Sequence, residues 1–159
     1  MILDVCCGPK HFWFDRDNPN VIFGDKRKEE FVLKYASGSR DIDVSPMLLH
    51  DFTALPFGNN QFEMVVFDPP HLIKAGENSY MRRKYGILDA DWKGELTLGF
   101  SECLRVLEPG GTLIFKWNEV QATVAEVMEC CSIQPLFGHK SGKASKTHWL
   151  CYKKEKQND

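Results

Sequence analysis

Near its amino terminus the chain reads Met1-Ile2-Leu3-Asp4-Val5-Cys6-Cys7-Gly8. The apolar run up to Cys6 predicts a short strand, and Gly8 predicts a turn directly after it. A glycine in such a turn lets the backbone approach a ligand closely, because no Cβ atom stands in the way. This strand and turn therefore predict one border of a ligand site.

Strand-like and helix-like segments alternate beyond this point. Short β-branched or aromatic runs predict further strands over Asn20–Phe23, Pro46–His50, Glu63–Phe67 and Thr112–Trp117. The segments Ser132–Phe137 and Thr147–Tyr152 predict a closing antiparallel pair. Alternation of strands with helices predicts an α/β fold with a mainly parallel sheet and helices on both faces.

Three helices are expected between these strands. The first begins at Asp91, carries apolar residues at near-fourfold spacing as far as Leu107, and is stopped by Pro109-Gly110-Gly111. The second follows Asn118 as N-cap and extends its apolar stripe to Cys131. The third is predicted over Lys26–Tyr35. The apolar stripes indicate packing against the sheet.

Length and composition narrow the class of protein. With 159 residues, of which 43% are hydrophobic, the chain is expected to form a single domain over residues 1–159 and not to be disordered. Its apolar runs are too short to span a membrane, and no targeting peptide is visible. Six cysteines without a Cys-x-x-Cys pair predict a reduced, cytoplasmic protein without a metal site. A net charge of −2 means that any nucleic-acid partner must be held by local basic patches.

Aspartates follow three successive predicted strands, as Asp25, Asp51 and Asp68. In a parallel sheet these strand ends face one crevice, where ligands bind. Asp25 is placed to accept hydrogen bonds from ribose hydroxyls. Asp51 is placed to accept a hydrogen bond from an adenine amino group, with Phe52 or Leu55 against the adenine ring. Asp4, inside the first strand, is a candidate for an ammonium group.

The segment from Cys6 to His11 lacks the Gly-x-Gly-x-x-Gly pattern that cradles a pyrophosphate. This argues against a nicotinamide dinucleotide. S-adenosylmethionine, which joins a nucleoside to a positively charged amino-acid end, fits the acidic strand ends better.

These residues resemble the motifs of class I S-adenosylmethionine-dependent methyltransferases. Leu3-Asp4-Val5-Cys6-Cys7-Gly8 is similar to the family's acidic-x-Gly-x-Gly motif, with Cys6 and Lys10 in place of the flanking glycines. The stretch from Leu104 to Gly111 resembles the family's turn before the fifth strand. The resemblance implies a three-layer Rossmann-like fold whose seven strands have the order 3-2-1-4-5-7-6, the last one antiparallel. It implies cofactor contacts from Asp4, Cys6, Cys7, Gly8, Asp25, Asp51, Phe52 and Asp68.

The predicted fourth strand is followed by Asp68-Pro69-Pro70-His71. By itself this motif is a rigid turn that ends strand pairing, because proline lacks an amide donor. In this position it resembles the Asp/Asn-Pro-Pro-aromatic signature of methyltransferases that act on amino nitrogens. The carboxylate of Asp68 and the carbonyl of Pro69 are expected to accept both N–H bonds and so to aim the nitrogen lone pair at the methyl group. His71 departs from the family's aromatic residue, which stacks on the target base. The resemblance implies an exocyclic amine of adenine or cytosine as the acceptor, and adenine N6 in DNA or RNA is the expected one.

Basic and aromatic residues are predicted to surround this motif. Taken alone such clusters are typical of solvated surface, but beside an amino-methylation site they favour a nucleic-acid substrate. The candidate substrate contacts are Lys74, Arg82, Arg83, Tyr85, Lys116, Trp117, Lys140 and Lys143. A separate target-recognition region does not fit in 159 residues. The open alternatives are a methyltransferase for small molecules or proteins, and a cofactor-binding subunit that needs a partner subunit or a second copy.

Overall fold

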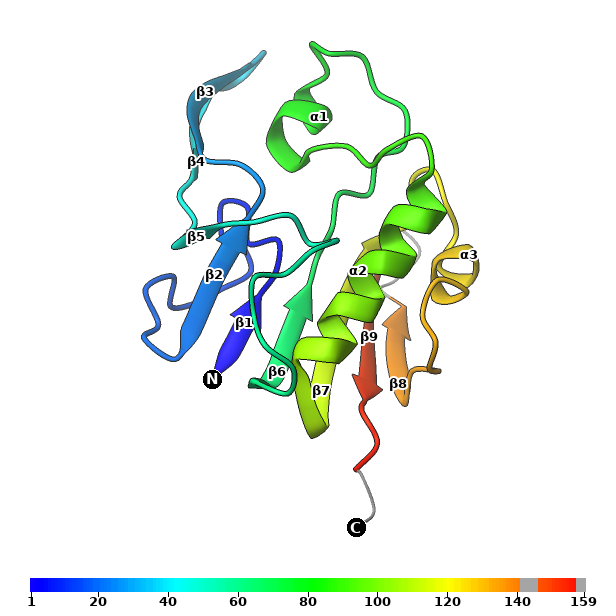
Figure 1. Cartoon of the computed structure of the whole chain (residues 1–159). Coiled ribbons are helices and arrows are strands. Elements are labelled where there is room, and N and C mark those ends of the chain that lie inside the picture. Colours follow the sequence, from blue (N-terminus) through cyan, green and yellow to red (C-terminus); the bar gives the residue numbers. More distant parts are fainter. Residues whose placement is uncertain (141–145, 157–159) are drawn as a thin grey trace.

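The computed structural model describes residues 1–140 and 146–156, and Figure 1 gives the arrangement of their elements. In chain order these are β1 (Ile2–Asp4), β2 (Val21–Asp25), β3 (Glu29–Tyr35), β4 (Gly38–Val44), β5 (Leu48–Leu49), β6 (Phe62–Phe67), α1 (Tyr80–Tyr85), α2 (Trp92–Val106), β7 (Leu107–Asn118), α3 (Val124–Met128), β8 (Phe137–Lys140) and β9 (Thr147–Lys153).

Seven of the strands form one sheet, in the order β5-β2-β1-β6-β7-β9-β8. All neighbours pair in parallel except β9, which runs antiparallel to both β7 and β8. Counted along the chain without the separate hairpin β3–β4, this order reads 3-2-1-4-5-7-6. The predicted α/β class, the mainly parallel sheet and the antiparallel last strand are therefore confirmed, and the difference from the prediction is the inserted hairpin.

Helix α2 covers one face of the sheet (Figure 1). Its N-cap is the predicted Asp91, whose side chain accepts a hydrogen bond from the amide of Gly94 at 3.2 Å. On its buried side Phe100 has its ring centroid 4.7 Å from that of Phe115 on β7 and 5.4 Å from that of Phe67 on β6. Burial of such aromatic side chains is worth roughly 1.5–3 kcal/mol each, so this contact fixes the helix on the central strands.

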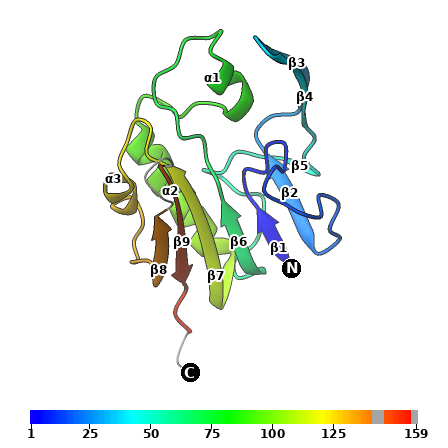
Figure 2. The same cartoon turned by 180° about the vertical axis from the view of Figure 1, so that it is seen from behind.

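The second face of the sheet differs from the three-layer prediction. Helices α2 and α3 both pack into the core that contains Leu3, whereas Ile2, on the opposite face, packs in a smaller cluster with Trp13 and Phe23. The cover of this smaller cluster comes from the irregular segment between β1 and β2. Figure 2 views this face, and no helix of the described residues lies over its strands. The physical reason is that residues 9–20 hold two prolines and many polar residues without a helical apolar stripe.

The helix predicted over Lys26–Tyr35 is wrong. Residues Glu29–Tyr35 form strand β3, which pairs antiparallel with β4 from Glu29↔Val44 to Tyr35↔Gly38. Phe31 and Leu33 alternate with exposed residues, which is the two-residue period of a strand rather than the 3.6-residue period of a helix.

The boundaries near the carboxyl terminus also differ from prediction. Asn118 is the last residue of β7, and the N-cap of α3 is Thr123, which forms a capping box with Glu126. The predicted strand Ser132–Phe137 begins only at Phe137, two residues after Pro135, whose missing amide cannot join a ladder. The start of β7 also differs from prediction: the strand begins at Leu107 and includes Pro109-Gly110-Gly111, which were expected to form a turn.

The hairpin β3–β4 and helix α1 stand beyond the carboxyl ends of the parallel strands (Figure 1). The two pack together through a small apolar cluster, in which Phe31 and Tyr80 lie against the buried residues Leu33, Ile42 and Val44. The guanidinium of Arg83 lies 5.0 Å from the centroid of the Phe31 ring. These contacts place α1 above the end of the sheet at which ligands are expected.

Candidate ligand-binding site

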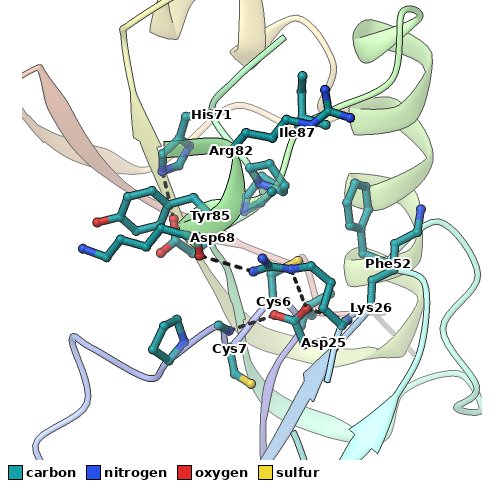
Figure 3. Close-up of a pocket in the computed structure, with 18 of the residues that line it drawn as sticks. Cys6, Cys7, Asp25, Lys26, Phe52, Asp68, His71, Arg82, Tyr85 and Ile87 are labelled. Carbon is teal, nitrogen blue, oxygen red and sulfur yellow. Dashed lines mark hydrogen bonds and ion pairs between the residues drawn. The ribbon is translucent and has the colours of Figure 1, made fainter. Parts of the chain in front are cut away.

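A cavity of about 590 Å³ lies at the carboxyl ends of the central strands. Its walls come from the ends of β1, β2, β6 and β7, from the segment after β1, and from α1. This is where the chain order of the strands reverses, from β1 outward in both directions, which is the usual ligand position in open α/β sheets. The volume falls within the range of small-molecule sites. Figure 3 shows Asp25 and Cys7 toward one end of the cavity, and Asp68, His71 and Tyr85 toward the other.

The first end of the cavity is built around Gly8 and Asp25. Gly8 has φ 48°, and a Cβ atom at this position would stand in open space. The amide of Gly8 donates to Oδ2 of Asp25 at 2.8 Å, and the amide of Arg27 donates to Oδ1 at 2.9 Å. Asp25 is thereby oriented at the end of β2, with the Arg27 guanidinium 3.6 Å away.

The two cysteines of the first turn also line the cavity. Burial raises the pKa of the Cys6 thiol well above its ordinary value, and the carboxylates of Asp25 and Asp4 add to the rise. Burial likewise raises the pKa of Cys7. Both thiols are therefore protonated at neutral pH, and neither is a candidate nucleophile.

The second end of the cavity centres on Asp68, at the end of β6. Its Oδ2 lies 2.6 Å from Nζ of Lys116 on β7, and its Oδ1 lies 3.1 Å from Nε2 of His71. Burial raises the pKa of Asp68, but the hydrogen bond and charge of His71 and those of Lys116 outweigh it, so the pKa is below its ordinary value. Asp68 is thus an ionised hydrogen-bond acceptor.

The contact with Asp68 also fixes the imidazole of His71. Its ring meets Trp117 edge-on, with centroids 4.9 Å apart and an interplanar angle of 81°. Lys116 is held in turn by aromatic neighbours, since its ammonium lies 5.3 Å from the ring centroid of Phe12 and 5.7 Å from that of Trp149. His71 is therefore held between Asp68 and Trp117.

Helix α1 borders the cavity opposite these strand ends. A Cβ atom on Gly86, directly after the helix, would lie 3.2 Å from Cγ of Pro70, so the two segments are in close contact. Gly86 has φ 83°, a conformation that favours glycine. The neighbouring Tyr85 lines the cavity and is 38% exposed, which leaves its ring available to a ligand.

Most of the residues predicted from the sequence meet at this cavity. Those that line it are Cys6, Cys7, Gly8, Asp25, Phe52, Asp68, Pro69, Pro70, His71, Arg82, Arg83, Tyr85 and Lys116. They come from six separate stretches of the chain, and the fold brings these stretches together at one cavity.

Other predicted residues lie elsewhere. Asp4 is fully buried beneath the cavity and accepts hydrogen bonds from the indole of Trp13 at 2.6 Å and from the Cys6 amide. Asp51 forms an ion pair of 2.9 Å with Lys26 and does not line the cavity. Trp117 points into the core, and Lys74 is exposed outside the cavity. Lys140 is the last residue of β8, and Lys143 lies outside the described residues.

The structure adds residues that the sequence did not single out. Arg27, Lys84 and the adjacent pair His11 and Phe12 line the cavity from three different segments. Lys84 belongs to the basic run after the Pro-Pro motif, which marked its neighbours Arg82 and Arg83. No sequence signal distinguishes His11 or Phe12, because their segment has no regular structure.

Among the described residues no helix is long and apolar enough to cross a membrane, and no group of three or more histidine, cysteine, aspartate or glutamate side chains could hold a metal ion.

No family model matches the sequence, and no curated protein matches it. Solved structures do share its fold. The PH0226 protein from Pyrococcus horikoshii OT3 superimposes with a TM-score of 0.64 at 14% identity, over 97% of this chain and 81% of that chain. A SAM-dependent methyltransferase from Methanosarcina mazei superimposes with a TM-score of 0.59 at 11% identity, over 98% of this chain and 92% of that chain. The [4+2]-cyclase SpnF superimposes with a TM-score of 0.56 at 14% identity, over 98% of this chain and 74% of that chain. At these identities the likeness shows a shared fold, and that fold serves more than one type of reaction.

Proposed function

We propose that this protein is an S-adenosylmethionine-dependent methyltransferase that methylates an amino nitrogen. The observation that carries the proposal is the joining of two predicted motifs in one cavity. Gly8 and Asp25 stand at one end, and Asp68-Pro69-Pro70-His71 stands at the other. The fold shared with a methyltransferase supports the same reading.

The first end of the cavity fits the cofactor. The open space over Gly8 admits a ligand against the backbone, and the Asp25 carboxylate still has lone pairs free for ribose hydroxyls. Phe52 supplies an apolar wall for an adenine ring. When bound there, S-adenosylmethionine supplies an electrophilic methyl group on a positively charged sulfur.

The protonation state of Asp68 favours an amine as acceptor. A general base works best with a pKa near the operating pH, whereas the pKa of Asp68 is below its ordinary value. A hydroxyl or thiol acceptor must lose a proton to become a strong nucleophile, but a neutral amine already has a lone pair. The Asp68 carboxylate and the Pro69 carbonyl are suited to hold the two N–H groups. A nitrogen held in this way would become positively charged on accepting the methyl group, and it would then release a proton to water.

We further propose that the amine belongs to an adenine-type base, with N6 of adenine in DNA or RNA as the acceptor. His71 is held edge-on against Trp117, so the exposed ring of Tyr85 is the candidate platform for such a base. A small molecule or a protein side chain is the second candidate acceptor. A cofactor-binding subunit of a larger methyltransferase is the third, and would bind cofactor but turn over only with its partner.

Two measurements test the proposal. Calorimetry with S-adenosylmethionine and S-adenosylhomocysteine measures cofactor binding, and failure to bind either one would refute the cofactor assignment. Labelled S-adenosylmethionine is then incubated with total nucleic acid, protein and a metabolite extract, and the labelled fraction identifies the acceptor class.

The role of Asp68 is tested with the variant Asp68→Ala. Loss of a preorganised acceptor is expected to lower methyl transfer by about 100-fold or more, with cofactor binding largely retained. The matched control is Asp41→Ala, which removes an exposed carboxylate on β4. Full activity of Asp68→Ala would show that this carboxylate does not position the acceptor.

A further inference from the structure

Lys84 is the only buried lysine among the described residues, with 8% of its surface exposed. It is the penultimate residue of α1 and lines the cavity. Lys84 has no role in the methyl transfer proposed for Asp68 and Pro69. A lysine is almost never buried without a partner for its charge, so its surroundings are informative.

The described neighbours of the Lys84 ammonium are aromatic. It lies 4.7 Å from the ring centroid of Tyr85 and 5.8 Å from that of Tyr80. Burial lowers the pKa of Lys84, but hydrogen bonds with the two phenol groups outweigh it, so the pKa is above its ordinary value. The group is therefore a cation at neutral pH. No carboxylate in residues 1–140 and 146–156 lies within ion-pair distance of it.

The carboxylates buried around the cavity are already engaged. Asp25 is bonded to two backbone amides beside Arg27, and Asp68 is paired with Lys116 and His71. They leave the positive charge of Lys84 without a carboxylate partner.

His11 lines the same cavity as Lys84. Burial lowers its pKa to about 4, and the positive charges of Arg40, Lys84, Arg16 and Lys116 lower it further. Lys84 is thus one of the positive charges that act on His11 in this cavity.

The backbone of Lys84 is held in place. The guanidinium of Arg27 donates to the carbonyl oxygens of Arg83 at 3.2 Å and of Lys84 at 3.5 Å. On the other side Gly86 is in contact with Pro70 of the reactive motif. These contacts hold the backbone from which the Lys84 side chain extends, so a ligand would not have to order this segment first.

We propose that Lys84 binds an anionic oxygen group, a carboxylate or a phosphate, of a ligand held in this cavity. The inference rests on the proposed function for the identity of that ligand. Two sources offer this chemistry: the amino-acid carboxylate of the cofactor, and an acidic group on the methyl acceptor.

The test compares pairs of ligands of which one member carries an anionic group and the other does not. S-adenosylhomocysteine is paired with 5′-methylthioadenosine, which lacks the amino acid, and adenosine 5′-monophosphate is paired with adenosine. Binding is measured by calorimetry for the wild type, for Lys84→Gln and Lys84→Met, and for the control Lys153→Gln, which alters an exposed lysine at the far end of β9. Circular dichroism confirms that each variant is folded.

Loss of a charged hydrogen bond is expected to weaken binding of the anionic member by about 10- to 100-fold, and to leave its neutral partner unchanged. Selective loss for S-adenosylhomocysteine supports the proposal and assigns the cofactor carboxylate. Selective loss for adenosine monophosphate supports it and assigns an acidic acceptor. Equal affinities in wild type and both Lys84 variants, for every ligand that binds, overturn it.

A separate titration with inorganic phosphate keeps this result distinct from failure of the proposed function. If the wild type binds no adenosine ligand, the methyltransferase proposal fails. A rise in melting temperature with phosphate that disappears in Lys84→Gln still supports the anion site, and a rise of the same size in both proteins, or in neither, overturns it.

Discussion

Asp4 is fully buried at the end of β1. Burial raises its pKa from 3.8 to about 7; the nearby charges of Asp68 and Asp25 add to the rise, and hydrogen bonds from Trp13 and Cys6 oppose it. Between these two values the folded state keeps a proton that the unfolded state has released. Stability therefore falls as pH rises through this window. A tenfold change in a dissociation constant is worth about 1.4 kcal/mol, so the total loss is about 4 kcal/mol.

The substitution Asp4→Asn isolates this effect, because asparagine resembles the neutral acid and can still accept from the indole of Trp13. The free energy of unfolding is measured in urea between pH 5 and 8 for both proteins. The variant should gain about 3 kcal/mol relative to the wild type across that range, which is the part of the total that falls within it. The control Asp41→Asn, at an exposed site on β4, should follow the wild type. Parallel curves for Asp4→Asn and the wild type would refute the raised pKa.

Three further substitutions test other parts of the structure. Lys116→Gln removes one cation from Asp68 and so raises the pKa of that carboxyl. The acidic limb of the methyl-transfer pH profile should therefore move to higher pH. An unmoved limb would contradict the pairing of Lys116 with Asp68. Gly99→Ala places a Cβ 2.7 Å from two aromatic rings under α2, so urea unfolding should show a loss of about 1–3 kcal/mol, whereas a more stable variant would argue against this packing. Arg105→Met breaks an ion pair of 2.6 Å with Glu102 and frees two loop carbonyls before β6, which should cost about 2 kcal/mol; an unchanged unfolding midpoint would show that the loop is held otherwise.

The parts of the fold that were predictable have a local signal. The central strands are short apolar runs, and α2 has both a capping aspartate and a long apolar stripe. The segment Glu29–Tyr35 has no such local signal, because its strand forms only by pairing with β4. The strand β8 likewise depends on β9, because a strand is stable only with a partner and its bounds follow the register.

The candidate site was predictable to the extent that it depends on strand ends. Asp25 and Asp68 lie at the same edge of a parallel sheet, because each follows its strand directly. Side-chain direction was not predictable in this way. Asp51 also follows a strand, yet its carboxylate is turned to Lys26 and to the next turn, where the amide and hydroxyl of Thr53 hold it.

The sequence by itself determined the α/β class, the parallel sheet and the two motifs that end β1 and β6, since these depend on residues adjacent in the chain. Only the tertiary structure decided which charges meet across the cavity. Lys116 reaches Asp68 from 48 residues away, and Lys84 is buried between tyrosines without a carboxylate partner in the described chain. Burial and pairing of charge depend on neighbours that are distant in sequence, and these neighbours set the ionisation of Asp68 and Asp4.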